Sequence, residues 1–425
     1  MTEVSKSELD LFTLPPTQIA LQSGSYVTKN PAEIPNEHCI RLCYTVSQGF
    51  FADMAKSYLT FKVRIAGATE TVNKAGPVNL WGHSCFEQIS IKVNDVVITE
   101  TTNLYPYEAL IGTLLSYGSD AKKSHLTLAG YAKDEGAKMD SHDPSNANCN
   151  TGLAARSALV SAGQTTEMVI RPFTALFQQD RLLPSGTNIE ITLIPSKSTF
   201  NLMADAEDGS GKYTTTISVT QLHGRQAKVM PSVMASIITE REKRNILLPM
   251  RKLTTTPISM NTGSQTLTRT ISNGVLPRRI WCVMVEEKAR FGSYKKNPFN
   301  FQHFNVNDFY LTVNSVPVPQ KHFTPNFDRN MYKECYFSLF SQMGCMFDDC
   351  GMDISYDDYK KGHMILCFDL TADMEDGDHR ELRKTGDVNL DIKLTAPLGA
   401  AIDILCIQEI DTVVEIDNNN KVHIQ

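Results

Sequence analysis

The sequence predicts an all-β protein made of two tandem antiparallel sandwiches, each with one short helix and long surface loops. Two observations support this fold class. Short segments alternate apolar and polar residues, which is typical of strands that bury one face, and turn residues separate them. In addition, a pattern from the first half of the chain recurs in the second half, which indicates that one sandwich was duplicated.

The clearest unit of this pattern spans residues 77–118. From Ile89 to Val93 apolar and polar side chains alternate, so we expect a half-buried strand there. Residues 107–117 place apolar side chains at the spacing of an amphipathic helix, and Gly118 stands where such a helix ends.

Residues 298–344 repeat this unit about 220 residues later. The matched markers, first and second copy in turn, are Pro77, Asn79 and His83 with Pro298, Asn300 and His303; Val93-Asn94 with Val313-Asn314; Glu108–Gly118 with Glu334–Gly344; Phe173–Ala175 with Leu370–Ala372; and Gly186–Leu193 with Gly386–Leu394, the last with a slip of one residue. Because the markers recur in the same order at similar separations, we expect a true duplication.

The chain divides into four expected segments, and its strands are short and numerous. The polar N-terminal stretch ends in a Pro pair and is expected to be an arm, and a short helix at 232–244 is expected to join the halves. The segments are an arm at 1–16, a first sandwich at 17–230, a connector at 231–249 and a second sandwich at 250–425. Expected strands are 19–27, 39–46, 58–65, 89–93, 167–174, 187–194 and 213–230, then 253–260, 265–271, 279–285, 303–318, 364–371, 387–395 and 401–416, with the second helix at 334–344.

Two polar loops, 120–163 and 205–212, interrupt the first half. The first is long for a compact domain, so we expect it to be functional or disordered, or else a solvated excursion without a partner.

Composition narrows the class of protein. The 425 residues carry a net charge of −6, which gives no overall attraction for nucleic acid. The N-terminus lacks the apolar stretch of a secretory signal and no segment is apolar enough to span a bilayer, so we expect a soluble protein made inside a cell. The 10 cysteines are scattered through strand-like segments, where they are expected to pack as small apolar side chains rather than form disulfides.

Motifs for catalysis or metal binding are incomplete. Gly209–Lys212 resembles part of a phosphate loop, but Tyr213 stands where a Ser or Thr is required. The Cys39/Cys43 and Cys345/Cys350 pairs lack a second ligand pair at zinc spacing, so core or loop thiols are expected. The acidic residues Asp348, Asp349, Asp357 and Asp358 and the run 373–378 do not match a calcium-binding loop and are expected to be solvated.

The remaining polar candidates have structural explanations. His83 and His303 stand at equivalent places in the repeat, so we expect a shared structural hydrogen bond. Basic residues gather in two groups, one of which could face a nucleic acid, although charged runs are more often solvated surface. The groups are Arg241, Lys243, Arg244, Arg251 and Lys252, and Arg278, Arg279, Arg290, Lys295 and Lys296. We predict no catalytic, cofactor-binding or metal-binding residues and no enzyme activity.

The sequence resembles the double jelly-roll major capsid proteins of icosahedral double-stranded DNA viruses. Its short motifs are most similar to those of the capsid proteins of Polinton (Maverick) elements and adintoviruses. The similarity covers nearly the whole chain and is weakest in the two polar loops. Its motifs are structural: SELDLF at 7–12, PPTQ at 15–18, NLYPYEALIGTLLSYG at 103–118, KNPFNFQHFNVN at 296–307, YFSLF at 336–340, CFDLTAD at 367–373 and VEIDNNNKV at 414–422.

The resemblance implies two eight-stranded jelly rolls and an assembly role within a virion. Three chains would form a homotrimer with six rolls around one axis, giving a pseudo-hexagonal capsomer that tiles a shell around DNA. The implied partners are neighbouring capsomers, penton or minor capsid proteins and, weakly, packaged DNA, with no small-molecule substrate. The loop at 120–163 would belong to an outer tower, and the arm at 1–16 would reach neighbouring chains.

Two other functions stay open. A minor capsid protein at the vertices of the same virion is one, although those proteins resemble a single roll. A non-viral ligand-binding sandwich, or an enzyme built on cupin-like rolls, is the other, although a metal-dependent cupin needs clustered His and carboxylate ligands that the sequence lacks.

Overall fold

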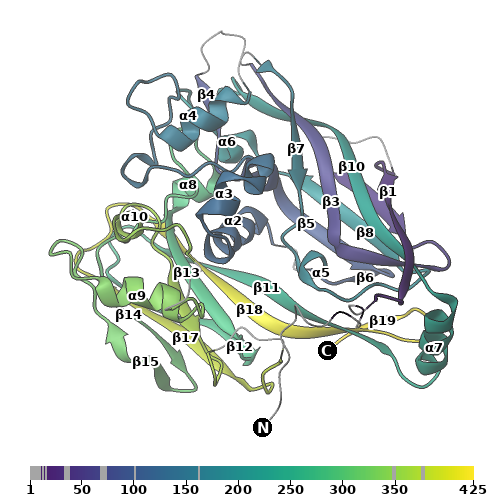
Figure 1. Ribbon diagram of the computed structural model, residues 1–425. Coiled ribbons are helices and arrows are strands. Elements are labelled where there is room, and N and C mark those ends of the chain that lie inside the picture. Colours follow the sequence, from purple (N-terminus) through teal and green to yellow (C-terminus); the bar gives the residue numbers. More distant parts are fainter. Residues whose placement is uncertain are drawn as a thin grey trace.

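The computed structural model describes residues 11, 14, 17–32, 39–67, 74–99, 102–160, 163–346, 351–374 and 379–425. Figure 1 shows two β-rich halves side by side, with helix α2 (Tyr105–Ser116) between them. No helix in the described part of the chain is long and apolar enough to cross a membrane.

The first half is an eight-stranded roll of two four-stranded sheets. One sheet has the order β1 (Leu21–Lys29), β10 (Thr214–Val229), β3 (Phe50–Ala66) and β7 (Thr166–Ile170). The other has the order β2 (Ile40–Thr45), β8 (Asn188–Pro195), β5 (Phe86–Val93) and β6 (Val96–Val97). All pairs within these sheets are antiparallel.

The second half repeats this arrangement strand for strand. One sheet has the order β11 (Ile246–Met260), β18 (Ile402–Ile416), β13 (Arg279–Glu286) and β16 (Leu366–Asp369), with β19 (Val422–Ile424) added on β18. The other has the order β12 (Thr266–Val275), β17 (Thr385–Leu394), β14 (Val306–Val313) and β15 (Val316–Phe323). When β4, β9 and β19 are set aside, each half has eight strands in chain order. In both halves the first, eighth, third and sixth of these form one sheet and the other four form the second sheet. The predicted pair of antiparallel sandwiches is confirmed.

The repeated Val-Asn dipeptide marks the same turn in both rolls. Asn94 between β5 and β6, and Asn314 between β14 and β15, have positive φ angles of 45° and 49°. Each side chain accepts a hydrogen bond from the backbone N–H at the start of the neighbouring strand, Asn188 at 2.7 Å and Asp387 at 3.1 Å. Asn tolerates this left-handed conformation better than most residues, which explains why it recurs there. The structure matches Asn188 with Asp387 and Ile189 with Val388, so the sequence alignment of Gly186–Leu193 with Gly386–Leu394 is wrong in register by one to two residues.

Short elements fill the connections between the long strands. The helices are α1 (Trp81–Ser84), α3 (Ser119–Lys123), α4 (Thr151–Ala158), α5 (Ala175–Gln178), α6 (Ser198–Asn201), α8 (Glu287–Phe291), α9 (Lys333–Ser341) and α10 (Tyr356–Lys360), with 3-10 turns η2 (His125–Ala129) and η3 (Gly136–Lys138). Strands β4 (Ala75–Pro77) and β9 (Leu202–Ala204) pair with each other. Helix α7 (Pro231–Arg241) links the rolls and buries none of its residues, and β11 begins soon after it. The proposed domain boundaries stay a prediction.

Helix α2 differs from the amphipathic helix expected at 107–117. Every residue from Tyr105 to Leu115 is buried, because the helix is enclosed by both rolls. The Tyr107 ring packs edge-on against Phe299 of the second roll, with ring centroids 5.6 Å apart. A helix that is covered on all sides has no solvent face, so its polar residues need partners instead.

The loop at 120–163 is the largest correction to the expectations. Among its described residues are the helix α4 and a buried network centred on Arg156. The Arg156 side chain donates to Asp134 Oδ1 at 2.7 Å, to the carbonyl of Pro77 at 2.8 Å and to that of Ala132 at 2.6 Å. Because the buried Arg156 side chain finds three acceptors, the described part of this polar segment folds as a packed element rather than a solvated excursion.

Three strand expectations also need correction. The strand expected at 253–260 is β11, which begins at Ile246, inside the segment expected to be the connector. The single strand expected at 303–318 is instead the hairpin of β14 and β15. Strand β3 begins at Phe50, eight residues before the expected start at Tyr58. Asp53, Lys56 and Ser57 hid this extension, because polar residues there interrupt the alternation.

Candidate assembly surfaces

The first roll contacts the second through the connection between its strands β7 and β8. Helix α5, in the connection from β7 to β8 of the first roll, packs against β11 of the second roll (Figure 1). Just beyond α5, Arg181 donates to the carbonyl of Leu247 at 2.8 Å. The Thr255 hydroxyl of β11 donates to Glu108 of α2 at 2.6 Å. The β11 flank of the second roll therefore rests on the β7–β8 connection of the first.

A largely buried polar network joins the rolls at the end that carries the 120–163 segment, called here the loop-bearing end. Lys122 donates from Nζ to the carbonyls of Leu114, at 3.1 Å, and of Met352 in the second roll. Burial lowers the pKa of Lys122 to about 8. Lys133 lies 3.2 Å from Asp353 and 3.0 Å from Asp358. These contacts hold the 120–163 segment against the second roll.

Further contacts run between the polar connections of the two halves. The backbone N–H of Asn297 donates to Asp140 at 3.0 Å, and Lys296 lies 3.5 Å from the same carboxylate. The Tyr294 hydroxyl donates to the carbonyl of Tyr213 at 2.6 Å. With hydrogen bonds at several separate places, the two rolls form one unit.

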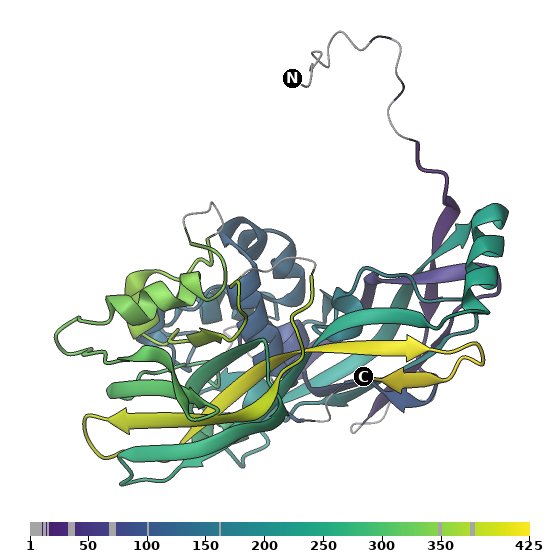
Figure 2. The ribbon, with the colours of Figure 1, turned by 90° about the horizontal axis from the view of Figure 1, so that it is seen from below.

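The equivalent flank of the first roll is open. All nine residues of β1 are exposed or half-exposed, whereas β11 buries several of its side chains. Apolar side chains ahead of β1 and on it are also exposed, among them Ile19 at 75% and Leu21. Figure 2 shows β1 at the outer edge of the molecule near α7, and Met230, just before α7, donates to the carbonyl of Ala20 at 2.9 Å.

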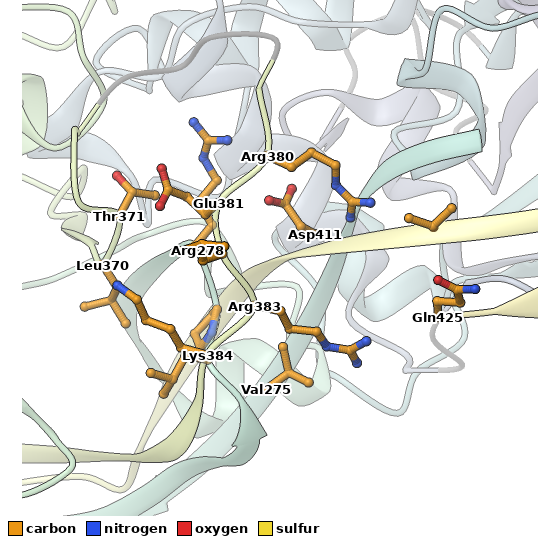
Figure 3. A pocket seen from close by; sticks show the side chains of 14 residues that line it. Val275, Arg278, Leu370, Thr371, Arg380, Glu381, Arg383, Lys384, Asp411 and Gln425 are labelled. Carbon is orange, nitrogen blue, oxygen red and sulfur yellow. The ribbon is translucent and has the colours of Figure 1, made fainter. Parts of the chain in front are cut away.

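A cavity of about 240 Å³ lies in the second roll, between the β16–β17 connection and the end of β18 (Figure 3). Its lining mixes apolar residues with a basic rim. The apolar residues are Val275, Leu276, Pro277, Leu370, Leu382 and Val413, and the basic ones are Arg278, Arg380, Arg383 and Lys384. Backbone hydrogen bonds fix the walls: Leu276 donates to Lys384 at 2.9 Å, and Leu370 to Arg278 at 2.8 Å.

The repeated histidines His83 and His303 make different hydrogen bonds, although the same hydrogen bond was expected in both copies. His83 is buried and lies 2.7 Å from the Tyr105 hydroxyl. His303 accepts from the backbone N–H of Asn305 at 2.9 Å and stacks on Phe327. Burial lowers the pKa of His83 to about 3 and that of His303 to about 4, so both are neutral near pH 7. The two rings occupy matched places in the chain but support different local structures.

The described cysteines are free thiols, as expected. Cys282 and Cys406 face each other across β13 and β18 with their sulfur atoms 3.6 Å apart. Cys39 and Cys43 lie on or next to β2 and are exposed to different degrees, and Cys350 lies outside the described residues.

The other motif candidates do not assemble a site in the described structure. Gly209–Lys212 is an exposed turn leading into a strand, not into a helix that could bind phosphate. Asp358 caps α10 through Ser355 and pairs with Lys133. Asp373, His379 and Glu381 lie near one another on the surface, and we assign no metal to them. Asp348, Asp349 and residues 375–378 lie outside the described residues.

The second basic group largely finds acidic partners rather than forming one face. Arg279 pairs with Asp369 at 2.8 Å in a fully buried site, and Arg290 pairs with Asp403. Lys295 and Lys296 pair with Glu207 at 2.6 Å and Glu286 at 3.1 Å. In the first group, Arg241 donates to Asn420, and Arg244 pairs with Glu240 at 2.9 Å. Neither group supplies a set of nucleic-acid contacts by itself.

Sequence reasoning missed the basic residues from Arg380 to Lys384. They follow an acidic run, and nothing in their spacing indicates a cavity. Their one available signal is a match to the first half, where Arg181–Leu183 has the same Arg-x-Leu pattern.

Comparisons with known proteins place the fold. No family model matches the chain. An uncharacterized protein of Caenorhabditis elegans is 25% identical over 357 residues, which cover 80% of each chain.

Solved virus structures match the whole chain. A chain of the Sputnik virophage matches with a TM-score of 0.67 and 12% identity, covering 100% of this chain and 93% of that one. The mavirus major capsid protein matches at 0.55 and 11%, covering 100% and 95%. The PBCV-1 virus capsid matches at 0.60 and 8%, covering 97% and 98%. At these identities the likeness shows the fold alone: the chain has the double jelly-roll fold of major capsid proteins.

Proposed function

We propose that this chain is a viral major capsid protein that forms homotrimeric, pseudo-hexagonal capsomers. These would tile an icosahedral shell around double-stranded DNA and contact neighbouring capsomers and penton or minor capsid proteins, so the protein would reside in the virion. The likeness to capsid proteins over the whole chain supports this proposal. The sequence motifs favour the Polinton and adintovirus lineage within that group.

The observation that carries the proposal is the unequal exposure of equivalent flanks. Within one chain the β11 flank is covered by the β7–β8 connection of the first roll, while the β1 flank is open. A contact between different faces of the two rolls is heterologous, and repeating it closes a ring if the rotation permits. In a ring of three chains, first and second rolls would then alternate around one axis. The second roll of each chain would cover β1 of its neighbour.

The alternatives are less well supported. A minor vertex protein built on one roll does not explain why the chain carries two. A ligand-binding sandwich or cupin-like enzyme needs a site of convergent polar ligands, and the two histidines singled out in the sequence lie in separate environments with different partners. For DNA contact we assign no residues, because the second basic group is largely paired with carboxylates.

Negative-stain imaging of the purified protein tests the proposal. Class averages with hexagonal outlines, built from three two-lobed chains, are the expected result. Single two-lobed particles at every concentration would contradict it and favour a binding protein.

A further inference from the structure

The two rolls carry the same three-residue pattern in equivalent connections. Arg181 to Leu183 precedes β8 and Arg380 to Leu382 precedes β17, each as Arg-x-Leu. Arg181 stands seven residues before Asn188, whose backbone N–H donates to the turn residue Asn94. Arg380 likewise stands seven residues before Asp387, whose N–H donates to Asn314. By fold position, therefore, Arg380 corresponds to Arg181 and Leu382 to Leu183.

Their surroundings are opposite. Leu183 is fully buried and its backbone pairs with Ala52 in both directions, at 2.8 and 2.9 Å. Leu382 is 84% exposed. Arg181 donates to the carbonyl of Leu247 as the chain enters β11, whereas Arg380 makes no ion pair or hydrogen bond within the described part of the chain. Leu183 is paired within its own roll, so the contact that the second copy lacks is the one that Arg181 makes with β11 of the other roll.

The cavity beside this segment, about 240 Å³, has room for one or two apolar side chains of a neighbouring segment (Figure 3). Arg380, Arg383 and Lys384 come from the segment along its rim, and the apolar residues Val275 and Val413 belong to β12 and β18. An apolar floor with a rim of basic side chains, beside the carboxylates of Glu381 and Asp411, suits a peptide with apolar side chains and free carbonyl groups.

We propose that residues 17–21 of a second copy of this chain lie across the mouth of this cavity. Leu21 begins β1 as Ile246 begins β11, and residues 17–21 lie exposed. Ile19 and Leu21 supply exposed apolar side chains for the floor, and their backbone carbonyls supply acceptors for Arg380. The inference rests on the proposed function, because it names the residues through which neighbouring chains of the trimer meet.

Directed cross-linking tests the contact. Ile19→Cys and Leu382→Cys are placed on separate, differently tagged chains that are expressed together, with the exposed Cys43 replaced by Ser in both. Mild oxidation is expected to give a covalent band containing one chain of each tag on a non-reducing gel. Leu128→Cys, on the exposed loop-bearing end of the first roll, replaces Leu382→Cys in the control and is expected to give no such band.

The mass of the same samples separates the two proposals. A mass of three chains with the specific cross-link supports the contact. The same mass without the cross-link overturns the contact and leaves the capsomer standing, whereas a single-chain mass at all concentrations overturns both.

A charge variant gives a second readout that does not depend on new cysteines. Arg380→Glu is expected to raise the concentration at which trimers dissociate by at least about tenfold, since an acidic side chain repels the carbonyl groups it should bind. Lys123→Glu, an exposed change on the loop-bearing end, is the matched control and is expected to leave that concentration unchanged. Equal dissociation of the two variants would overturn the contact.

Discussion

The two rolls share their strand order but differ at their first strands. β1 is exposed along its length, whereas β11 rests against the other roll. Strand order follows from the period-two pattern, which both halves carry, so duplication preserved it. Exposure depends on what lies next to each roll, and within one chain only β11 has a neighbouring roll.

The rolls also bury charge in different places. In the first roll the fully buried pair Arg156–Asp134 ties the 120–163 segment together. In the second roll the fully buried pair Arg279–Asp369 links neighbouring strands β13 and β16. The buried ion pair of the first roll thus stabilises a long connection between strands, whereas that of the second roll stabilises the pairing of two strands in a sheet. Four predictions test how far this contrast extends, beginning with the largest effect.

Arg156→Met is expected to lower the free energy of unfolding by about 3–5 kcal/mol, because it leaves the Asp134 carboxylate buried without its cation. Denaturant unfolding measures the loss. Lys321→Ala is the control: its pair with Glu334 is exposed, so the expected loss is below about 1 kcal/mol. Equal losses in the two variants would contradict the assigned role of the buried network.

Acid should destabilise both rolls by similar amounts down to pH 4, through His83 in the first and His303 in the second, and the loss through His83 should continue to a lower pH. Burial lowers the pKa of His83 from 6.5 to about 3, so between these values the unfolded chain binds a proton that the folded chain does not. Stability is therefore complete above pH 6.5 and is lost as the pH falls, by about 3 kcal/mol at pH 4. Unfolding of His83→Gln between pH 7 and 4 should show a flatter pH dependence than the native protein. His303→Gln should flatten the curve by nearly the same amount over this range, because a folded pKa of about 4 also gives a loss of about 3 kcal/mol at pH 4. Identical curves for the native protein and His83→Gln would refute the assignment.

The repeated turns should differ modestly in their sensitivity. Asn94→Ala is expected to cost about 1–2 kcal/mol, because Ala disfavours positive φ and cannot accept from Asn188. Asn314→Ala should cost less, since Asn94 also donates to the carbonyl of Asn420 at 2.6 Å. Glycine at either site keeps the conformation and should recover part of the loss in thermal unfolding. A larger loss at Asn314 than at Asn94 would argue against the extra hydrogen bond.

The smallest effect on folding is expected on the open strand. Ser25→Asp lies at an exposed position of β1, so unfolding should change by less than about 0.5 kcal/mol. It should nevertheless weaken trimers, because it buries a charge at the proposed contact. Thr262→Asp, in an exposed turn after β11, is the control and should leave both properties unchanged. Loss of stability without loss of association would show that β1 serves the single chain.

Much of the fold could be predicted from the sequence because its evidence is local. Alternation from Ile89 to Val93 and the repeated Val-Asn turn depend on neighbours in the chain, and both hold in the structure. The order within 120–163 could not be predicted, because Arg156, Asp134 and Pro77 meet only in three dimensions. The segment at Arg380 was missed for a similar reason: the partner that we propose for it lies on another chain.

The mass of the native protein in solution tests the central claim most directly. Light scattering on the eluted protein should give three copies of the 47.3 kDa chain, about 142 kDa, because in the proposed ring the open β1 flank of each chain meets the second roll of the next. A mass of 47.3 kDa at every concentration tested would contradict the claim that β1 is exposed in order to receive a neighbour.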